Sequence, residues 1–349
     1  MTANWQLCNN RLIIFDLKGE FFERILHQKT EAYMTFKTDT TELRKVYCDG
    51  LIALAQQDER IVVLDADLMR ANGTLPFQAA FAERTFDVGV AEANMIGVAA
   101  GLAACGKIPF ANSFTAFATR RCFDQITISV AYAKLPVKIC GTDAGLSAQM
   151  NGGTHMSLED VSLMRSLPNM AIFEPTDETQ LRQAMPQIAA YDGPMYIRLF
   201  RREVETIFDE NYRFVLGKAD TLKEGRDVVI FATGIMVWRS LEAAEQLAAM
   251  GIDAAVVNIH TLRPLDRDAV LTYAAQCGAV VTAENHSVTG GLGSAVCELL
   301  AENEPVPVER IGVRDSFGAV GKLGYLAKKF NMEPGDIVAA AKKAISRKA

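Results

Sequence analysis

The chain has 349 residues, of which 36 are Lys or Arg and 42 are Asp or Glu, for a formal net charge of -6. Its length predicts about two domains at roughly 150 residues each, and its hydrophobic content of 50% excludes disorder for most of the chain. The acidic balance argues against nucleic acid or an anionic membrane as a partner.

No apolar run reaches the roughly 18 to 20 residues that a membrane-spanning helix needs, so we expect no integral membrane segment. Seven cysteines are scattered along the chain, and none is in CxxC spacing. This pattern predicts neither a disulfide framework nor a zinc site. We therefore expect reduced cysteines, mostly packed in cores, and a cytoplasmic protein.

The first 33 residues differ in pattern from the rest of the chain. Their apolar patch, Leu12 to Phe15, is too short for the core of a signal peptide. Met34 begins a segment typical of a natural start followed by a capped helix. We expect residues 1–33 to be an N-terminal extension without catalytic groups, or an over-long gene start.

From about residue 40 the chain alternates helices with apolar, β-rich runs. Continuous apolar strands separated by helices predict a parallel sheet that is covered on both faces. We expect a ligand at the carboxyl ends of its strands. The predicted strands are 61–66, 108–112, 137–142, 170–173 and 195–199, and the predicted helices are 41–57, 92–104, 115–132 and 177–190.

A polar stretch at 201–213 interrupts this alternation and predicts a linker. The alternation then resumes, so we expect an α/β protein with two doubly wound domains, at 34–205 and 219–349, joined by a linker at 206–218. The second domain has predicted strands at 228–233, 254–259, 279–283 and 307–312, helices at 236–249, 266–276 and 292–301, and two final helices.

The predicted helix 92–104 begins at Glu92 and carries small residues three and four positions apart, namely Gly97, Ala100, Gly101 and Ala104. A face almost without side chains lets another backbone approach closely, which indicates a subunit interface. Glu92 has two readings: a solvated first-turn carboxylate that complements the helix dipole, or a buried functional carboxylate.

A second candidate segment is the aromatic one that contains Phe114, Phe117 and Arg120. Their i, i+3, i+6 spacing predicts one face of a helix, where two rings could hold a flat heteroaromatic ligand. Aromatic residues at this spacing more often form an apolar helix face that packs into the protein core. Neither segment decides a function by itself.

Taken together, these motifs resemble the transketolase family. They are Gly89-x-x-Glu92-x-x-Met95-x-Gly97-x-Ala, the aromatic cluster, and Gly152-Gly-Thr-His155 in a glycine-rich loop. The resemblance is to the pyrimidine-binding half of transketolase, and it extends over about residues 40–349. It implies a transketolase C-terminal domain in the second half of the chain.

One family motif is missing. Family members bind the diphosphate of thiamin and a divalent metal through a Gly-Asp-Gly motif and a later Asn. The nearest sequences in this chain are Cys48-Asp-Gly50 and Tyr191-Asp-Gly193, and each lacks the first glycine. The chain therefore resembles the C-terminal subunit of a split transketolase. The resemblance implies an obligate N-terminal partner that carries Gly-Asp-Gly and holds most of the Mg²⁺ site. It also implies an α2β2 assembly, with self-association through the 92–104 helix or the C-terminal domain.

The resemblance implies thiamin diphosphate as cofactor and transfer of a two-carbon ketol unit from a ketose to an aldose, as in the pentose phosphate pathway. Glu92 would hydrogen-bond N1′ of the aminopyrimidine, and His155 would face the substrate as a second catalytic group. The implied cofactor-binding residues are Asp67, Leu68, Glu92, Phe114, Phe117 and Arg120, and the implied substrate-binding residues are Arg44, Asp143, Asn151, His155 and Arg201.

Some positions depart from the family pattern. Asp143 stands where a phosphate-contacting histidine is common, Ala71 replaces a hydroxyl residue, and Asn151 replaces an acidic residue. An anion in place of a cation should repel a phosphate. We therefore expect a specialised ketose or aldose substrate, whose phosphate is altered or missing.

Two other readings remain open. The β subunit of a 2-oxo acid dehydrogenase E1 component shares both domains and the cofactor but decarboxylates its substrate. A non-catalytic, doubly wound regulatory subunit is the alternative from another class. The glycines at Gly290–Gly293 do not form the GxGxxG of a dinucleotide site and indicate a turn.

Overall fold

The computed structural model of the protein describes residues 6–8, 11–13 and 41–348. Near the start of the chain, β1 (Gln6–Cys8) pairs antiparallel with β2 (Arg11–Ile13). This hairpin belongs to a unit of its own, Met1–Thr35, and Phe36–Ala349 forms the other unit. Our expectations for residues 1–33 and for a start at Met34 fall mostly outside the described residues.

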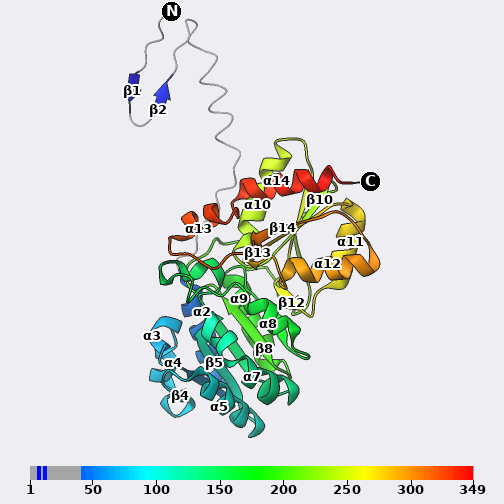
Figure 1. Ribbon diagram of the computed structural model, residues 1–349. Helices are drawn as coiled ribbons and strands as arrows, with labels where there is room; N and C mark the ends of the chain where they lie inside the picture. Colours follow the sequence, from blue (N-terminus) through cyan, green and yellow to red (C-terminus); the bar gives the residue numbers. More distant parts are fainter. Residues whose placement is uncertain (1–5, 9–10, 14–40, 349) are drawn as a thin grey trace, which may run out of the picture. The chain divides into compact units, whose positions relative to one another are not determined.

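The larger unit contains two sheets, each with helices around it (Figure 1). The first sheet has the strand order β12-β7-β8-β6-β5-β3-β4, and its strands are parallel except β12. The strands are β3 (Ile61–Asp65), β4 (Thr85–Asp87), β5 (Ile108–Phe114), β6 (Lys138–Thr142), β7 (Ala171–Phe173), β8 (Met195–Leu199) and β12 (Thr261–Arg263).

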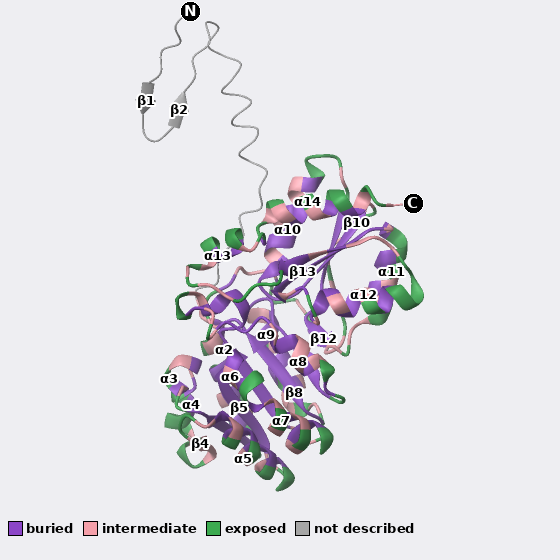
Figure 2. Cartoon of the chain, in the orientation of Figure 1, coloured by how far each residue is buried: buried purple, intermediate pink, exposed green. Residues whose placement is uncertain are grey.

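Helices cover both faces of the first sheet because successive strand side chains point to opposite faces. Ile61 and Val63 of β3 pack with α2 (Leu43–Gln57), α4 (Leu75–Ala80) and α9 (Glu178–Ala190). Val62 and Leu64 pack with α5 (Glu92–Ala104) and α8 (Asp160–Ser166) on the other face. Figure 2 shows the result, with buried strands and helices that are buried on the side facing the sheet. A short helix, α3 (Met69–Asn72), follows β3.

The second sheet has the order β14-β13-β10-β11-β9 and is parallel except for the edge strand β9. Its faces are covered by α10 and α14 on one side and by α11 and α12 on the other. The elements are β9 (Asp220–Lys223), β10 (Val228–Ala232), α10 (Met236–Ala248), β11 (Ala254–Asn258), α11 (Arg267–Cys277), β13 (Val280–Ser287), α12 (Leu292–Asn303), β14 (Val308–Val313), α13 (Leu323–Lys329) and α14 (Pro334–Ile345). The predicted α/β class with two doubly wound domains is confirmed.

The prediction of one helix over 115–132 is wrong. The chain forms α6 (Thr115–Ala118), a 3₁₀ turn at Arg120–Cys122, α7 (Phe123–Gln125) and a π-helical segment at Ile126–Tyr132. The first break is at Thr119, whose φ of −117° and ψ of −78° depart strongly from ideal helix values and whose hydroxyl donates to the Thr115 carbonyl at 2.7 Å. Phe114 is the last residue of β5, so Phe114, Phe117 and Arg120 do not share one helix face.

Three short strands, β4, β9 and β12, were not predicted. β12 is the least expected, because it follows β11 in the chain but pairs antiparallel with β7 of the first sheet, Thr261 opposite Phe173. An edge strand of three residues has too few side chains to show an alternating pattern. The second half of the chain therefore completes the sheet of the first half.

The segment predicted as a linker is packed against α9. Asp177, the N-cap of α9, accepts the backbone N–H groups of Ile207 at 2.8 Å and Phe208 at 2.7 Å. Farther along, Gln187 bonds the backbone carbonyl of Phe214, which is buried. The connection between the two sheets is therefore held by hydrogen bonds along its length.

A buried ion cluster joins the two sheets. Arg198 of β8 is fully buried and donates to Asp160 at 2.7 Å, to Glu174 at 2.7 Å and to the Asn285 carbonyl of β13 at 2.7 Å. Glu174 also accepts from the hydroxyl of Thr233, which follows β10, at 3.0 Å. One guanidinium thus connects β8 of the first sheet with β13 of the second.

Candidate active site

The candidate residues gather at the carboxyl ends of adjacent parallel strands. Phe114 ends β5, Asp143 directly follows β6, and Arg201 lies two residues after β8. These strands are neighbours in the sheet, so their ends meet at one edge. This is the edge at which ligands bind in doubly wound proteins.

Glu92 is a buried carboxylate. Only 2% of the residue is exposed, and both of its oxygens accept from Nη1 of Arg121, at 2.8 and 2.9 Å. The Arg121 side chain is 46% exposed, and its guanidinium lies 4.1 Å from the centre of the Phe117 ring. Of the two readings of Glu92, the structure has the buried one, and its partner is a long, half-exposed cationic side chain that lies over an aromatic ring.

Phe114, Phe117 and His155 form a cluster of three rings. The ring centres of Phe114 and Phe117 are 6.1 Å apart, and His155 lies edge-on to them, at 6.1 and 5.2 Å. Phe114 is buried, whereas Phe117 and His155 are half-buried. Two of the three rings are therefore partly accessible to solvent, which a fully buried core stripe would not be.

A group of charged side chains adjoins the rings on the other side. Arg201 lies 5.8 Å from the Phe114 ring centre, and its Nε is 3.2 Å from Oδ1 of Asp143. Arg44 is held beside Arg201, because its backbone N–H donates to the Arg201 carbonyl at 3.2 Å. The Arg44 guanidinium donates to Glu42 and to the carbonyl of Ala71. Contacts thus run without a gap from Asp143 through the rings to Glu92.

Four other predicted site residues are not brought into this chain of contacts. Arg120 is exposed and pairs with Glu159 at 2.8 Å, away from Glu92. Asn151 is exposed at the end of the loop that follows β6. Asp67 and Leu68 follow β3, where Asp87 and Asp65 accept their backbone N–H groups. Asp67 has a φ of 60°, which fits an Asp in the left-handed region.

Arg121 and Asn285 were missed. Arg121 rather than Arg120 meets Glu92, because the break at Thr119 turns the following residues away from a regular helix. Asn285 accepts from the backbone N–H of Leu146 at 2.8 Å and donates to the carbonyl of Ala144 at 3.0 Å. It thereby fixes the loop between Asp143 and His155 from the second sheet. The available signal in the sequence was its place between two other side chains that can bond or titrate, Glu284 and His286, after an apolar run.

We expect Asn285→Ala to loosen this loop. The change leaves one buried N–H and one buried C=O without partners, which should lower the free energy of unfolding by about 1–3 kcal/mol. If this loop, which carries His155, contacts a substrate, the change should also raise the KM for that substrate. Asn303→Ala is the matched control, because that amide donates only to the Leu299 carbonyl within α12. Chemical denaturation and steady-state kinetics measure both effects. Equal KM values for parent and Asn285→Ala would contradict the anchoring role.

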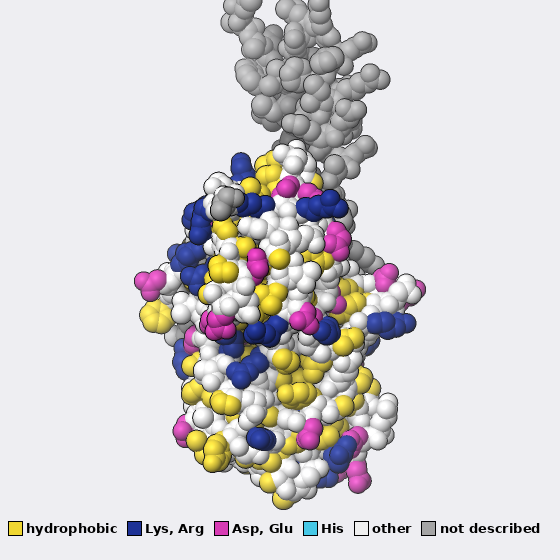
Figure 3. Space-filling model, turned by 90° about the vertical axis from the view of Figure 1, so that its right-hand side faces the viewer, with side chains coloured by type: hydrophobic (Ala, Val, Ile, Leu, Met, Phe, Trp, Pro, Cys, Tyr) yellow, Lys and Arg dark blue, Asp and Glu magenta, His cyan; other side chains and the backbone are white. Residues whose placement is uncertain are grey.

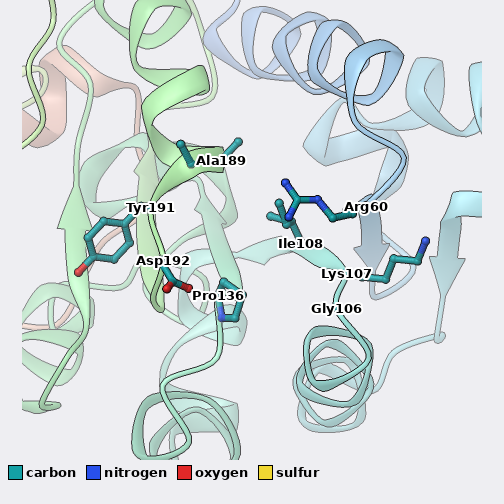
Figure 4. Close-up of a pocket in the computed structure, with 9 residues that line it drawn as sticks. Arg60, Gly106, Lys107, Ile108, Pro136, Ala189, Tyr191 and Asp192 are labelled. Atoms are coloured by element: carbon teal, nitrogen blue, oxygen red, sulfur yellow. The ribbon is translucent and has the colours of Figure 1, made fainter.

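A depression of about 390 Å³ lies at the opposite edge of the first sheet (Figure 4). Its lining residues precede strands rather than follow them: Lys107 precedes β5, and Pro136 precedes β6. This depression holds none of the predicted site residues. The candidate residues lie instead at the carboxyl ends of β5, β6 and β8.

Helix α5 exposes small residues. Gly97 and Gly101 are exposed, and no heavy atom lies within 4 Å of the place where a Cβ would stand on either. On the face shown in Figure 3, basic, acidic and apolar side chains are mixed, without one large patch of a single charge. Within the described residues, no three His, Cys, Asp or Glu side chains are grouped so that they could hold a metal ion, and no helix is long and apolar enough to cross a membrane.

Comparison with known proteins identifies the family. Residues 39–206 match the family model described as "Transketolase, pyrimidine binding domain", and residues 217–337 match "Transketolase, C-terminal domain". The chain belongs to the transketolase family. It is 60% identical over 306 residues to the 6-deoxy-6-sulfo-D-fructose transketolase subunit SqwH of Clostridium sp. (strain MSTE9), covering 88% of this chain and 95% of that protein.

Two further transketolase relatives are also single subunits or sections. A putative transketolase C-terminal section of Methanocaldococcus jannaschii is 43% identical and covers 83% of this chain and 92% of its own length. A solved structure described as a split gene transketolase, inactive beta4 tetramer, is 47% identical with a TM-score of 0.82, and covers 88% of this chain and 99% of that one. The chain is therefore a subunit of the split transketolase type.

Proposed function

We propose that this chain is the C-terminal subunit of a thiamin-diphosphate-dependent split transketolase that moves a two-carbon ketol unit from a ketose to an aldose. The observation that carries the proposal is the buried Glu92 carboxylate, whose partner Arg121 lies over Phe117 of the Phe114–Phe117–His155 ring cluster. The absence of Gly-Asp-Gly from the sequence supports a separate N-terminal subunit that binds the diphosphate and Mg²⁺.

The residues present fit thiamin diphosphate. When bound, this cofactor acts as the electron sink that makes cleavage of a C–C bond next to a carbonyl feasible. Phe114 and Phe117 offer ring surface for a flat pyrimidine, and Glu92 offers a desolvated carboxylate for a ring nitrogen. We propose that Glu92 holds a proton at that nitrogen, after Arg121, which is half exposed, has moved off the carboxylate.

We assign the other groups to the substrate. His155, which is half-buried against both phenylalanine rings, is suited to hydrogen bonding or proton transfer at sugar oxygens. Arg44 and Arg201 are suited to an anionic group at the far end of the sugar, because guanidinium groups bind such oxygens bidentately. Asp67, Leu68, Arg120 and Asn151 stay candidates for roles that depend on a partner subunit.

The relative that is 60% identical suggests the donor. Its name states that it acts on 6-deoxy-6-sulfo-D-fructose. We propose that this subunit also serves a ketose whose terminal carbon carries a sulfonate. The carboxylate of Asp143 beside Arg201 supports a terminal group other than an ordinary phosphate.

The proposal predicts that neither subunit is active alone. We expect this chain to copurify with an N-terminal transketolase subunit, and the complex with thiamin diphosphate and Mg²⁺ to form a new ketose from a sulfonated ketose donor and an aldose phosphate acceptor. Mass spectrometry of the products measures the transfer. Reduction of a lipoyl acceptor by the complex, without ketol transfer, would instead support the 2-oxo acid dehydrogenase reading.

We further propose self-association through the open face of α5, around Gly97 and Gly101, in an α2β2 assembly. The relative of known structure is described as a tetramer of its β subunit. Gly101→Leu would fill the open face and should lower the oligomeric mass measured by light scattering. An unchanged mass would contradict this interface.

A further inference from the structure

The arginines of the candidate site are accompanied by carboxylates. Arg44 is paired with Glu42, with Nε 2.7 Å from Oε2, and Arg201 is paired with Asp143. Arg202 is exposed and close enough to lower the pKa of both Asp143 and Arg201. Three guanidinium groups and two carboxylates leave this cluster with a formal charge of one positive unit.

Asp143 is an unusual member of the cluster. It is fully buried, and its Oδ1 accepts no hydrogen bond although it faces Arg201 at 3.2 Å. Burial raises its pKa to about 6, and the charges of Arg201 and Arg202 act against that rise. Its φ of 59° lies in the left-handed region, which Asp and Asn both tolerate. The backbone therefore explains a short polar side chain at 143, but not a negative charge.

We propose that Asp143 determines which anion the donor carries, by cancelling one arginine charge so that the site favours a singly charged sulfonate over a doubly charged phosphate. This inference rests on the proposed function, since it assumes that Arg44 and Arg201 bind the end of a sugar. It assigns Asp143 to selection between donors and not to the transfer step.

The charges of the two groups carry the argument. A phosphate ester holds about −1.5 to −2 charges near pH 7, whereas a sulfonate holds one and also offers three acceptor oxygens. A cluster with one net positive charge neutralises a sulfonate fully. The second charge of a phosphate meets the Asp143 carboxylate, in a partly buried place where like charges repel more strongly than in water.

The test compares two donors that differ only at the terminal carbon, 6-deoxy-6-sulfofructose and fructose 6-phosphate. The full complex of both subunits is used, with cofactor and Mg²⁺, and kcat and KM are measured with one common acceptor. In Asp143→Asn, we expect the ratio of kcat/KM for the sulfonate donor to that for the phosphate donor to fall by about 10- to 30-fold. Most of the change should be a lower KM for fructose 6-phosphate.

Two further variants separate charge from shape. Asp143→Glu keeps the charge and should keep the ratio within about threefold of the parent. Asp143→Gly removes the charge, tolerates the left-handed backbone and should shift the ratio as Asn does, so the test does not depend on one variant folding. Glu302→Gln removes one negative charge from an exposed position on α12 and should leave both donors unaffected.

The binding of each donor sugar to the complex is also measured by calorimetry, without an acceptor. This measurement tests the role of Asp143 separately from the proposed function. Sugar binding without ketol transfer would overturn the proposed function, while the affinity ratio would still test Asp143. The role of Asp143 would be overturned if the parent, Asp143→Asn and Asp143→Gly all showed the same preference for the sulfonate donor over the phosphate donor, measured by kinetics or by binding. If neither sugar binds to the complex, both proposals are overturned.

Discussion

Glu92→Gln is expected to slow ketol transfer by the assembled complex by about two to four powers of ten, the range lost with a general acid–base group. Glutamine has nearly the same shape, and its amide oxygen can still accept from Arg121, so the affinity for thiamin diphosphate should be largely unchanged. It cannot gain and release a proton at the ring nitrogen, which is the role we propose for the buried carboxylate. Turnover at saturating donor and titration of the cofactor measure the two quantities separately.

Glu298→Gln is the matched control for this prediction. Glu298 also pairs with an arginine, Arg165, at 2.6 Å, but its side chain is 61% exposed and lies on α12. The same chemical change there should alter turnover by less than about threefold, because exposed ion pairs contribute little. A Glu92→Gln complex that keeps parental turnover would remove Glu92 from the reaction.

Arg198→Met is expected to destabilise the chain by about 3–5 kcal/mol, the usual cost of leaving buried charges without their partner. Met has a similar length, but it leaves Asp160 and Glu174 uncompensated in a fully buried place and removes the bond to the Asn285 carbonyl. Burial already raises the pKa of Glu174, so this carboxyl should take up a proton in the variant. Urea unfolding monitored by circular dichroism measures the loss.

Arg182→Met provides the comparison. Arg182 pairs with Glu178 four residues earlier on α9, at 3.9 Å, and its side chain is 54% exposed. Such a surface pair contributes about 0.5 kcal/mol or less. If the two variants unfold at the same urea concentration, the Arg198 cluster does not hold the two sheets together.

Most of the strands that were predicted correctly are buried on both faces. β3, β6, β8, β10 and β11 are buried along their whole length, and β3, β10 and β11 appear in the sequence as apolar runs between helical segments. A strand that is buried on both faces is usually rich in apolar residues, so its own sequence indicates its burial. β12 has two buried residues of three, and what defines it as a strand is its pairing with β7, a partner about 90 residues earlier. Pairing over such a distance leaves no local pattern.

In the candidate site, too, some features were visible in the local sequence and others depend on the folded chain. The spacing of Glu92 at a helix start and of Phe114 near Phe117 was visible in the chain, and the structure brings these residues together with His155, Arg44, Asp143 and Arg201. Which arginine meets Glu92 was not visible, because it depends on the break after α6. A regular helix would direct Arg120 along the face of Phe117, whereas the turn at Thr119 directs Arg121 to Glu92.

Residue order alone was enough for the family, for its split-subunit type and for the two α/β domains, because burial patterns and short motifs are local and survive in a linear string. The pairing of Asp143 with Arg201, the anchoring of the 143–155 loop by Asn285 and the burial of Arg198 between the sheets arise only on folding. Each joins residues that are far apart in the chain or in different sheets, and the energy of such contacts depends on distance and desolvation, which a sequence does not contain.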